Sequence, residues 1–375
     1  MMKLMSSAPA RIPMYIQLKT YMMSQIQQGI WKPGDKIPSE NELAEQFNVS
    51  RITVKNAMAA FVNQGLIYRI QGKGSFISDS AALPLTPFEP VESLESCIAF
   101  LMPRLDNLYT ANLLTGIEQE LADHGYHVVF KLTHDRQEVE IKRLKELTQL
   151  GMKGIIIYPV EGETFNSEIL KLTLGDYPFV IVDRYLRGLD ANCVSSDNFT
   201  GAYEATKHLT SLGHTTISFL STAITGTTSI EDRLRGYEQA LSDAGLSIEY
   251  RLRLILNNHL SIYEQIKQYM LDHPDVTAIV ATTSTIGLFA MKSARELNLV
   301  VPRDLSIVCF DNQEKSELSE VPLTYIDQNE TNMGREAAKR VLSLIQNPIQ
   351  ERSILTLPCQ LIVRGSTVSP NLARS

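Results

Sequence analysis

The chain has 375 residues and a net charge of −7, a length that exceeds one small module and can bury a large core. No apolar stretch of about 18 residues occurs, so we expect neither a transmembrane helix nor a membrane partner. The opening MMKLMSSAPARIP lacks the apolar core of a secretory signal, and the four cysteines are scattered without a C-x-x-C pair, which together favour the cytoplasm.

The charge is unevenly distributed along the chain. Residues 1–80 hold nine Lys and Arg against five Asp and Glu, a net charge of +4, so the remainder carries −11. Such asymmetry indicates a basic segment for nucleic acid attached to an acidic body that does not bind it.

Residues 39–63 carry two short helix patterns. Ser39 followed by Glu42 is a capping box, which predicts a helix that begins there and ends near Phe47. Ser50 opens the second helix, and Gly65 suits the left-handed residue that ends it. The apolar stripe expected for this second helix consists of Ile52, Val54, Ala57, Met58 and Phe61.

Two strand patterns follow the helices. Residues 66–70 and 75–78 alternate around Gly72-Lys73-Gly74, which predicts a hairpin. Helix, tight turn, helix and β-wing together make a winged helix-turn-helix fold that binds DNA.

Several ordered motifs in this part of the chain match a known family. They are Pro33-Gly34-Asp35, Ile37-Pro38-Ser39-Glu40, Val49-Ser50-Arg51-x-Thr53-Val54-Lys55 and Gly72-Lys73-Gly74-x-Phe76. Together they resemble the DNA-binding signature of the GntR regulators from about Pro13 to Ile77. We therefore delimit a winged helix-turn-helix domain at residues 11–78.

The candidate DNA-binding residues lie at three places in this fold. The first turns of the second helix enter a major groove, where an arginine can bond a guanine edge. The N–H groups at the start of the preceding helix suit a phosphate, and the wing tip approaches the minor groove. Many GntR members have an arginine where this chain has Asn41. The predicted residues are Ser39, Glu40, Asn41, Arg51, Thr53, Lys55, Gln71, Gly72 and Lys73.

Residues 79–96 contain three prolines and no periodic pattern, which is typical of an extended linker. Beyond it, short apolar runs alternate with helical patterns. The predicted strands are 97–102, 127–132, 154–158, 179–183, 216–221, 252–256, 278–281 and 306–310, and the helices between them include 113–124, 138–150, 201–211, 233–244, 263–271 and 285–297. This alternation predicts an α/β fold with parallel, doubly wound sheets, divided into two lobes with a cleft between them.

The same region carries a second set of ordered motifs. They include Val182-Asp183, Ser196-Asp197-Asn198, Leu212-Gly213-His214, Arg233-Leu234-Arg235-Gly236-Tyr237, Val301-Pro302-x-Asp304-Leu305-Ser306 and Phe310-Asp311-Asn312. These resemble the effector domain of LacI-type repressors. The resemblance implies a two-lobed sugar-binding fold akin to periplasmic binding proteins, which also dimerises, and we place this domain at residues 97–368. A GntR reader joined to such a sensor resembles a bacterial family of arabinose-responsive regulators, which makes L-arabinose the first-choice effector.

Ligands of open α/β sheets bind beyond the carboxyl ends of the strands. Asp183 and Asp311 each end a predicted strand, so we expect both in one cleft, and Arg233 is expected to open a helix beside it. Carboxylates accept from sugar hydroxyls and a guanidinium donates to them. The resemblance also assigns Asp183, Arg233 and Asp311 to the effector. The full predicted set is Arg104, Asn107, Tyr109, Asp183, Arg233, Thr282, Asp311 and Gln328, with Tyr109 expected to cover a sugar ring and with Thr282-Thr283 standing where relatives often have Asn-Asp.

Motifs of catalysis do not appear. Gly72-Lys73-Gly74 lacks the third glycine of a dinucleotide fingerprint, and no P-loop or metal-ligand spacing occurs. We therefore expect no catalytic residues, no metal and no cofactor. The leading hypothesis is a homodimeric transcriptional repressor that binds double-stranded operator DNA and is released by a small sugar. The alternatives are an activator, a regulator responding to another sugar, a sugar-binding transport component and an α/β sugar enzyme.

Overall fold

The computed structural model describes residues 14–63, 65–79, 96–162, 166–222, 225–257, 260–312, 320–348 and 351–370. The chain divides into two compact units, Met1–Val91 and Glu92–Ser375, and each is described by itself. Almost all of the predicted linker, residues 79–96, lies outside the described residues.

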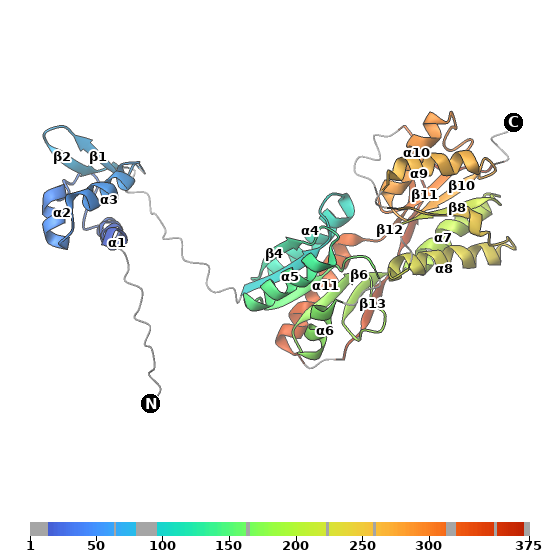
Figure 1. The fold of residues 1–375 in the computed structure, drawn as a ribbon, viewed down its shortest axis with the longest axis horizontal. Coiled ribbons are helices and arrows are strands. Elements are labelled where there is room, and N and C mark those ends of the chain that lie inside the picture. Colours follow the sequence, from blue (N-terminus) through green and yellow to red (C-terminus); the bar gives the residue numbers. More distant parts are fainter. Residues whose placement is uncertain are drawn as a thin grey trace. The chain divides into compact units, whose positions relative to one another are not determined.

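The first unit is a small helical domain with a two-stranded wing (Figure 1). Its elements are α1 (Met14–Gln27), α2 (Glu40–Phe47), α3 (Arg51–Asn63), β1 (Ile67–Ile70) and β2 (Gly74–Ile77), and the two strands are antiparallel. The predicted capping box is present, because Ser39 and Glu42 each accept a hydrogen bond from the other's backbone N–H. Asn48 ends α2 in the left-handed conformation, so the second helix can start within three residues.

The core of this unit comes from all three helices and from the wing. It includes Leu18, Met22, Leu43, Val54, Ala57, Met58, Phe61, Ile67 and Ile77. Helix α1, residues 14–27, was not predicted. The prediction that Ile52 belongs to the buried stripe of α3 was wrong, because its side chain is 71% exposed. Two residues along a helix correspond to about 200°, so Ile52 faces away from the buried stripe that begins at Val54.

The second unit consists of two lobes, each built on a six-stranded sheet (Figure 1). The first lobe contains β3 (Cys97–Met102), α4 (Leu108–Asp123), β4 (His127–Leu132), α5 (Gln137–Gln149), β5 (Gly154–Ile157), α6 (Ser167–Leu174), β6 (Phe179–Asp183), β7 (Cys193–Ser196), α11 (Glu330–Gln346) and β13 (Ile354–Leu357). Its strands are all parallel, in the order β13-β7-β6-β5-β3-β4.

The second lobe repeats this plan. It contains α7 (Asn198–Ser211), β8 (Ile217–Ser221), α8 (Thr228–Asp243), a 3-10 turn (Tyr250–Leu252), β9 (Arg253–Ile255), α9 (Ile262–Asp272), β10 (Ala278–Ala281), α10 (Ser284–Glu296), β11 (Ser306–Phe310), β12 (Thr324–Asp327) and β14 (Gln360–Ile362). The strand order is β14-β12-β11-β10-β8-β9, parallel except for β14. The chain crosses between the lobes three times, after β7, β12 and β13.

The α/β class and the parallel sheets agree with the prediction. The eight predicted strands all occur, within about two residues at their ends, whereas β7, β12, β13 and β14 were not predicted. Two helix starts were wrong by five residues. Helix α4 begins at Leu108 rather than at residue 113, and α8 begins at Thr228, so Arg233 lies in its second turn. No helix among the described residues is long and apolar enough to cross a membrane.

Glycines let two pairs of helices pack in close contact. A methyl group at Gly334 of α11 would overlap the backbone carbonyl oxygen of Leu113 in α4, and one at Gly116 would overlap that of Thr331. In the other lobe, Gly236 of α8 approaches the carbonyl oxygen of Phe199 in α7 in the same way. Each lobe is therefore held together at a backbone-to-backbone contact that excludes larger residues.

Gly334→Ala should lower the free energy of unfolding by about 1–3 kcal/mol, because the added methyl group forces α4 and α11 apart. This loss should appear although alanine favours a helix by about 1 kcal/mol over glycine. Denaturant unfolding measures it, with Thr115→Ala on the exposed face of α4 as the control. A Gly334→Ala protein as stable as the parent would contradict the close contact.

Candidate functional site

A cavity of about 150 Å³ lies between the two lobes of the second unit, where strands of both sheets end. The first lobe contributes Asn107, Tyr109, Thr110, Tyr158, Glu161, Asp183 and Arg184, and the second contributes Thr222, Ser229, Ile230, Arg233, Thr283, Ser284, Thr285, Asp311 and Gln328. This is the position at which parallel α/β sheets bind ligands.

The two aspartates occupy equivalent positions in the two lobes. Asp183 is the last residue of β6, and Asp311 directly follows β11. Both have positive φ angles, 78° and 69°, a conformation that non-glycine residues rarely adopt and that is concentrated at functional sites. The structure thus brings the two carboxylates to opposite walls of one cavity.

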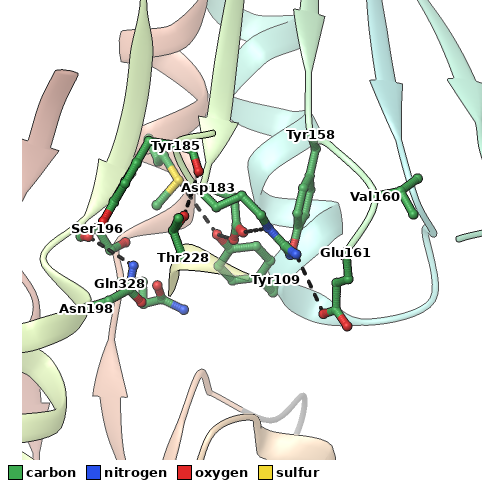
Figure 2. A network of polar contacts seen from close by, with 12 residues as sticks. Tyr109, Tyr158, Val160, Glu161, Asp183, Tyr185, Ser196, Asn198, Thr228 and Gln328 are labelled. Carbon is green, nitrogen blue, oxygen red and sulfur yellow. Dashed lines mark hydrogen bonds and ion pairs between the residues drawn. The ribbon is translucent and has the colours of Figure 1, made fainter. Parts of the chain in front are cut away.

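Asp183 is the centre of a buried network in the first lobe (Figure 2). Its carboxylate accepts hydrogen bonds from the Tyr109 hydroxyl and, at 3.0 Å, from Nε of Arg184. Arg184 also donates to the Tyr158 hydroxyl at 3.2 Å. Its Nη1 lies 3.7 Å from the Glu161 carboxylate and is buried, but it makes no hydrogen bond within the described residues. The hydroxyl of Thr222, another lining residue, is also buried without a hydrogen bond within the described residues, so two polar groups of the lining lack such a bond.

Arg233 is the centre of the corresponding network in the second lobe. Its guanidinium donates to the Asn198 side-chain oxygen (2.7 Å), the Thr282 carbonyl (2.6 Å) and the Gln328 side-chain oxygen (3.0 Å). It also lies 3.8 Å from the centre of the Phe310 ring. These contacts fix the cation rigidly at the cavity wall, and the Gln328 amide in turn donates to Asp311.

Burial shapes the protonation of this site. Desolvation raises the pKa of Asp311 to about 6, even though Arg233 acts in the opposite direction. Burial, together with the Asp311 charge, also raises the pKa of Glu330 at the start of α11 to about 7. Burial and the neighbouring Asp183 raise the pKa of Tyr109 well above its usual value, so its hydroxyl stays a proton donor.

Six of the eight predicted effector residues line the cavity. They are Asn107, Tyr109, Asp183, Arg233, Asp311 and Gln328. Asn107 also caps α4, because its side chain accepts from the Thr110 N–H at 2.9 Å. Tyr109 is 7% exposed and is held by Asp183 rather than lying open as a platform.

The other two predicted residues, Arg104 and Thr282, are not among those that line the cavity. Arg104 does not line it, because its exposed side chain forms an ion pair with Asp135. The Thr282 side chain does not line it either, and this residue contributes its backbone carbonyl to Arg233. The sequence analysis missed several lining residues, above all Arg184 and Tyr158. Both stand at the end of a predicted strand, and this position could have indicated that they line the cavity.

The predicted DNA-binding residues lie on α2, α3 and the wing of the first unit. Arg51 and Lys55 are exposed on α3, and neither side chain makes a hydrogen bond or ion pair within the described residues. Thr53 is already bonded to Ser50, with 2.8 Å between their hydroxyl oxygens. Gln71, Gly72 and Lys73 form the exposed turn between β1 and β2.

The start of α2 is less available than predicted. The Ser39 hydroxyl and its backbone N–H are both used in the capping box. Glu40 pairs at 2.9 Å with Arg69 of the wing, a contact that the sequence analysis did not anticipate. Asn41 is exposed. In the apo chain, α3 and the wing tip therefore present the freer polar groups.

Comparisons with known proteins cover both units. Residues 15–77 match the model of the bacterial regulatory proteins of the gntR family, and residues 206–367 match that of the periplasmic binding protein-like domain. The arabinose metabolism transcriptional repressor of Geobacillus stearothermophilus is 30% identical over 95% of this chain and 98% of its own length. Its counterpart from Halalkalibacterium halodurans is 30% identical over 94% and 96%.

Solved structures resemble the second unit. A LacI family transcriptional regulator from Enterococcus faecium with bound ribose is 26% identical, with a TM-score of 0.63, and the match covers 73% of this chain and 99% of that one.

We predict that Asp311 and Glu330 each contribute a decline in the stability of the ligand-free protein as the pH rises from about 4 to 7. Each of these carboxyls has a higher pKa in the folded protein than in the unfolded chain, so it keeps its proton in the folded protein at pH values where the unfolded chain has released it. Its contribution to the free energy of unfolding is therefore fully present below the pKa of the unfolded chain and is lost as the pH rises through the pKa of the folded protein. Unfolding temperatures across this range measure the effect. Asp311→Asn and Glu330→Gln should each reduce the decline, and Asp123→Asn, an exposed change on α4, should not. An equal decline in all variants would disprove the assignment.

Proposed function

The chain belongs to the family that includes the arabinose metabolism transcriptional repressors, and from this premise we propose that its effector is L-arabinose. It is a sugar-responsive, DNA-binding transcriptional repressor with a GntR-type reading domain and a LacI-like effector domain. The proposal concerns the identity of the sugar, the residues that hold it and the way it controls DNA binding.

The polar composition of the cavity carries this proposal. Asp183 and Asp311 supply acceptors on opposite walls, and Arg184 and Arg233 supply donors beside them. Such alternation matches adjacent sugar hydroxyls, each of which both donates and accepts. A cavity of about 150 Å³ suits a small sugar. The names of the two relatives and the ribose in the Enterococcus regulator both point to pentoses.

The lobes and the reading domain must communicate for the sugar to act. A homodimer supplies two reading heads, which fits a near-palindromic operator. Exposed apolar side chains on edge strands, Phe130 of β4 and Ile255 of β9, offer surfaces for such a dimer. Sugar binding would favour one arrangement of the lobes, and moving that equilibrium from 1:99 to 99:1 requires about 5.5 kcal/mol of differential affinity.

Binding without turnover is part of the proposal. The relatives are transcriptional regulators, and the cavity groups serve as donors and acceptors held by their neighbours. A repressor acts where the chromosome is, so we place the protein in the cytoplasm. In the following experiment a regulator of another sugar would be released by that sugar, a transport component would bind no duplex, and a sugar enzyme would consume the sugar.

Gel shifts on a duplex selected from a random pool test the function directly. L-arabinose should lower the fraction of bound DNA, and D-ribose, D-xylose and cellobiose should not. Arg233→Gln should bind the duplex normally but fail to respond to the sugar, because it loses three hydrogen bonds at the cavity wall.

Arg104→Gln is the matched control, since it removes an arginine that does not line the cavity, and it should respond like the parent protein. Release by another sugar alone would reject arabinose. A protein that binds no duplex at low salt would overturn the function itself, and consumption of the sugar would revive an enzyme.

Arg51→Ala should weaken binding of the selected duplex about ten-fold, because a guanidinium that bonds a guanine edge in two places is worth about 1–3 kcal/mol. Arg51→Lys keeps the charge but not the two-point geometry, so it should retain most affinity for random DNA and lose base preference. Fluorescence anisotropy titrations measure both. An Arg51→Ala protein with unchanged affinity and preference would remove this residue from the interface.

A further inference from the structure

The exposed face of α3 carries more than its two basic residues. Ile52 and Asn56 are also exposed there, between and beside Arg51 and Lys55. Residues four apart on a helix lie side by side, with Cβ atoms about 5–6 Å apart. Ile52 and Asn56 therefore form an adjacent apolar and amide pair on the helix that is predicted to enter the major groove.

Packing within the first unit does not explain Ile52. Among the other large apolar residues of α3, Val54, Met58 and Phe61 are at most 1% exposed and Val62 is partly buried, whereas Ile52 is 71% exposed. It is the most exposed of the large apolar side chains described in this unit. A β-branched residue also lowers helix propensity slightly, so neither the core nor the helix benefits from isoleucine at this position.

Asn56 is similarly unused by the fold. Its side chain is exposed and makes no hydrogen bond within the part of the chain that the structure describes. Its carboxamide offers one acceptor and a donor group in a planar arrangement. The structure thus leaves a methyl-bearing side chain and a free amide next to each other.

The A·T base pair complements this pair of side chains. In the major groove thymine presents its C5-methyl group, the apolar feature of that surface, and adenine presents the N6 donor and N7 acceptor that asparagine bonds in two places. Successive bases lie 3.4 Å apart along a strand, so two side chains 5–6 Å apart at their bases can reach the same or neighbouring base pairs.

We propose that Ile52 and Asn56 read A·T base pairs in the operator, with Ile52 against a thymine methyl group and Asn56 on an adenine. This inference rests on the proposed function, because it requires α3 to lie in the major groove. It adds a preference for A·T at defined positions to the guanine contact predicted for Arg51.

Single-atom changes in the DNA test the two contacts separately. The full-length protein is titrated with the selected duplex in which each thymine is replaced in turn by uracil, which removes only the methyl group. At one position per half-site the parent protein should lose about four-fold in affinity, the value of one buried methyl or methylene group. Ile52→Ala should bind the parent duplex about as weakly and show no further loss at that position.

Adenine is examined in the same way by replacement with 7-deazaadenine, which removes the N7 acceptor. The parent protein should lose affinity by several-fold at one position, and Asn56→Ala should be insensitive there. Ile30→Ala is the matched control, because Ile30 is a 56% exposed apolar residue of the same unit outside α3. It should keep the full uracil response.

The outcomes separate this inference from the function on which it rests. If no duplex is bound, the function fails. Suppose that the duplex is bound and that Arg51→Ala weakens binding. The thymine contact is then rejected if uracil lowers the affinity of the parent protein and of Ile52→Ala equally at every position. An unchanged 7-deazaadenine profile in Asn56→Ala rejects the adenine contact. Equal unfolding temperatures of the variants confirm that each change acts at the surface.

Discussion

Charged groups removed from water must be compensated by their neighbours, and in the second unit that requirement falls on Asp183, Arg184, Arg233 and Asp311. Each is 8% exposed or less. Each lies in a network that leaves little freedom of position, with Tyr109 and Tyr158 in one lobe and Asn198, Thr282 and Gln328 in the other. The parallel sheets make this possible, because their strands end at the same edge and bring these residues together without long loops. The cavity thus lies where the compensated buried charges of the two lobes meet.

The two units treat polar groups in opposite ways. In the second unit the cavity residues are hydrogen-bonded mainly to one another, with the Arg184 Nη1 and the Thr222 hydroxyl as exceptions within the described residues. In the first unit the small core uses the buried face of α3, and the opposite face keeps its polar and apolar groups exposed. A surface that reads DNA gains its partners only on binding, whereas a pocket that selects a small sugar must be organised beforehand to avoid the cost of ordering. The distribution of hydrogen bonds in the chain therefore reflects two different recognition problems.

Much of this architecture could be predicted from sequence because its signals are local. The capping box at Ser39, the glycine-closed wing and the apolar strand runs all report on their own segments. The misses arise where local pattern is weak. Strand β7 ends in Ser195 and Ser196, so its sequence is not a continuous apolar run. Strands β13 and β14 are short edge strands with exposed residues, so they also lack the pattern of a buried strand. Arg184 was not predicted to line the cavity although it bonds the adjacent Asp183, and its other hydrogen-bond partner, Tyr158, lies 26 residues away. Arg104 does not line the cavity, and nothing near it in sequence indicates its partner Asp135.

The three crossings between the lobes limit how the sensor can move. Each lobe is internally stiff, because its helices touch backbone to backbone at glycines and its sheet is buried on both faces. The three connecting segments leave one rigid lobe side by side and enter the other. They therefore allow the lobes to bend about a common axis but resist sliding and independent twisting. A ligand that draws the two carboxylate-bearing walls together would then rotate the lobes about that single axis. Such a linkage would convert a contact in the cavity into an angular displacement at the far ends of both lobes.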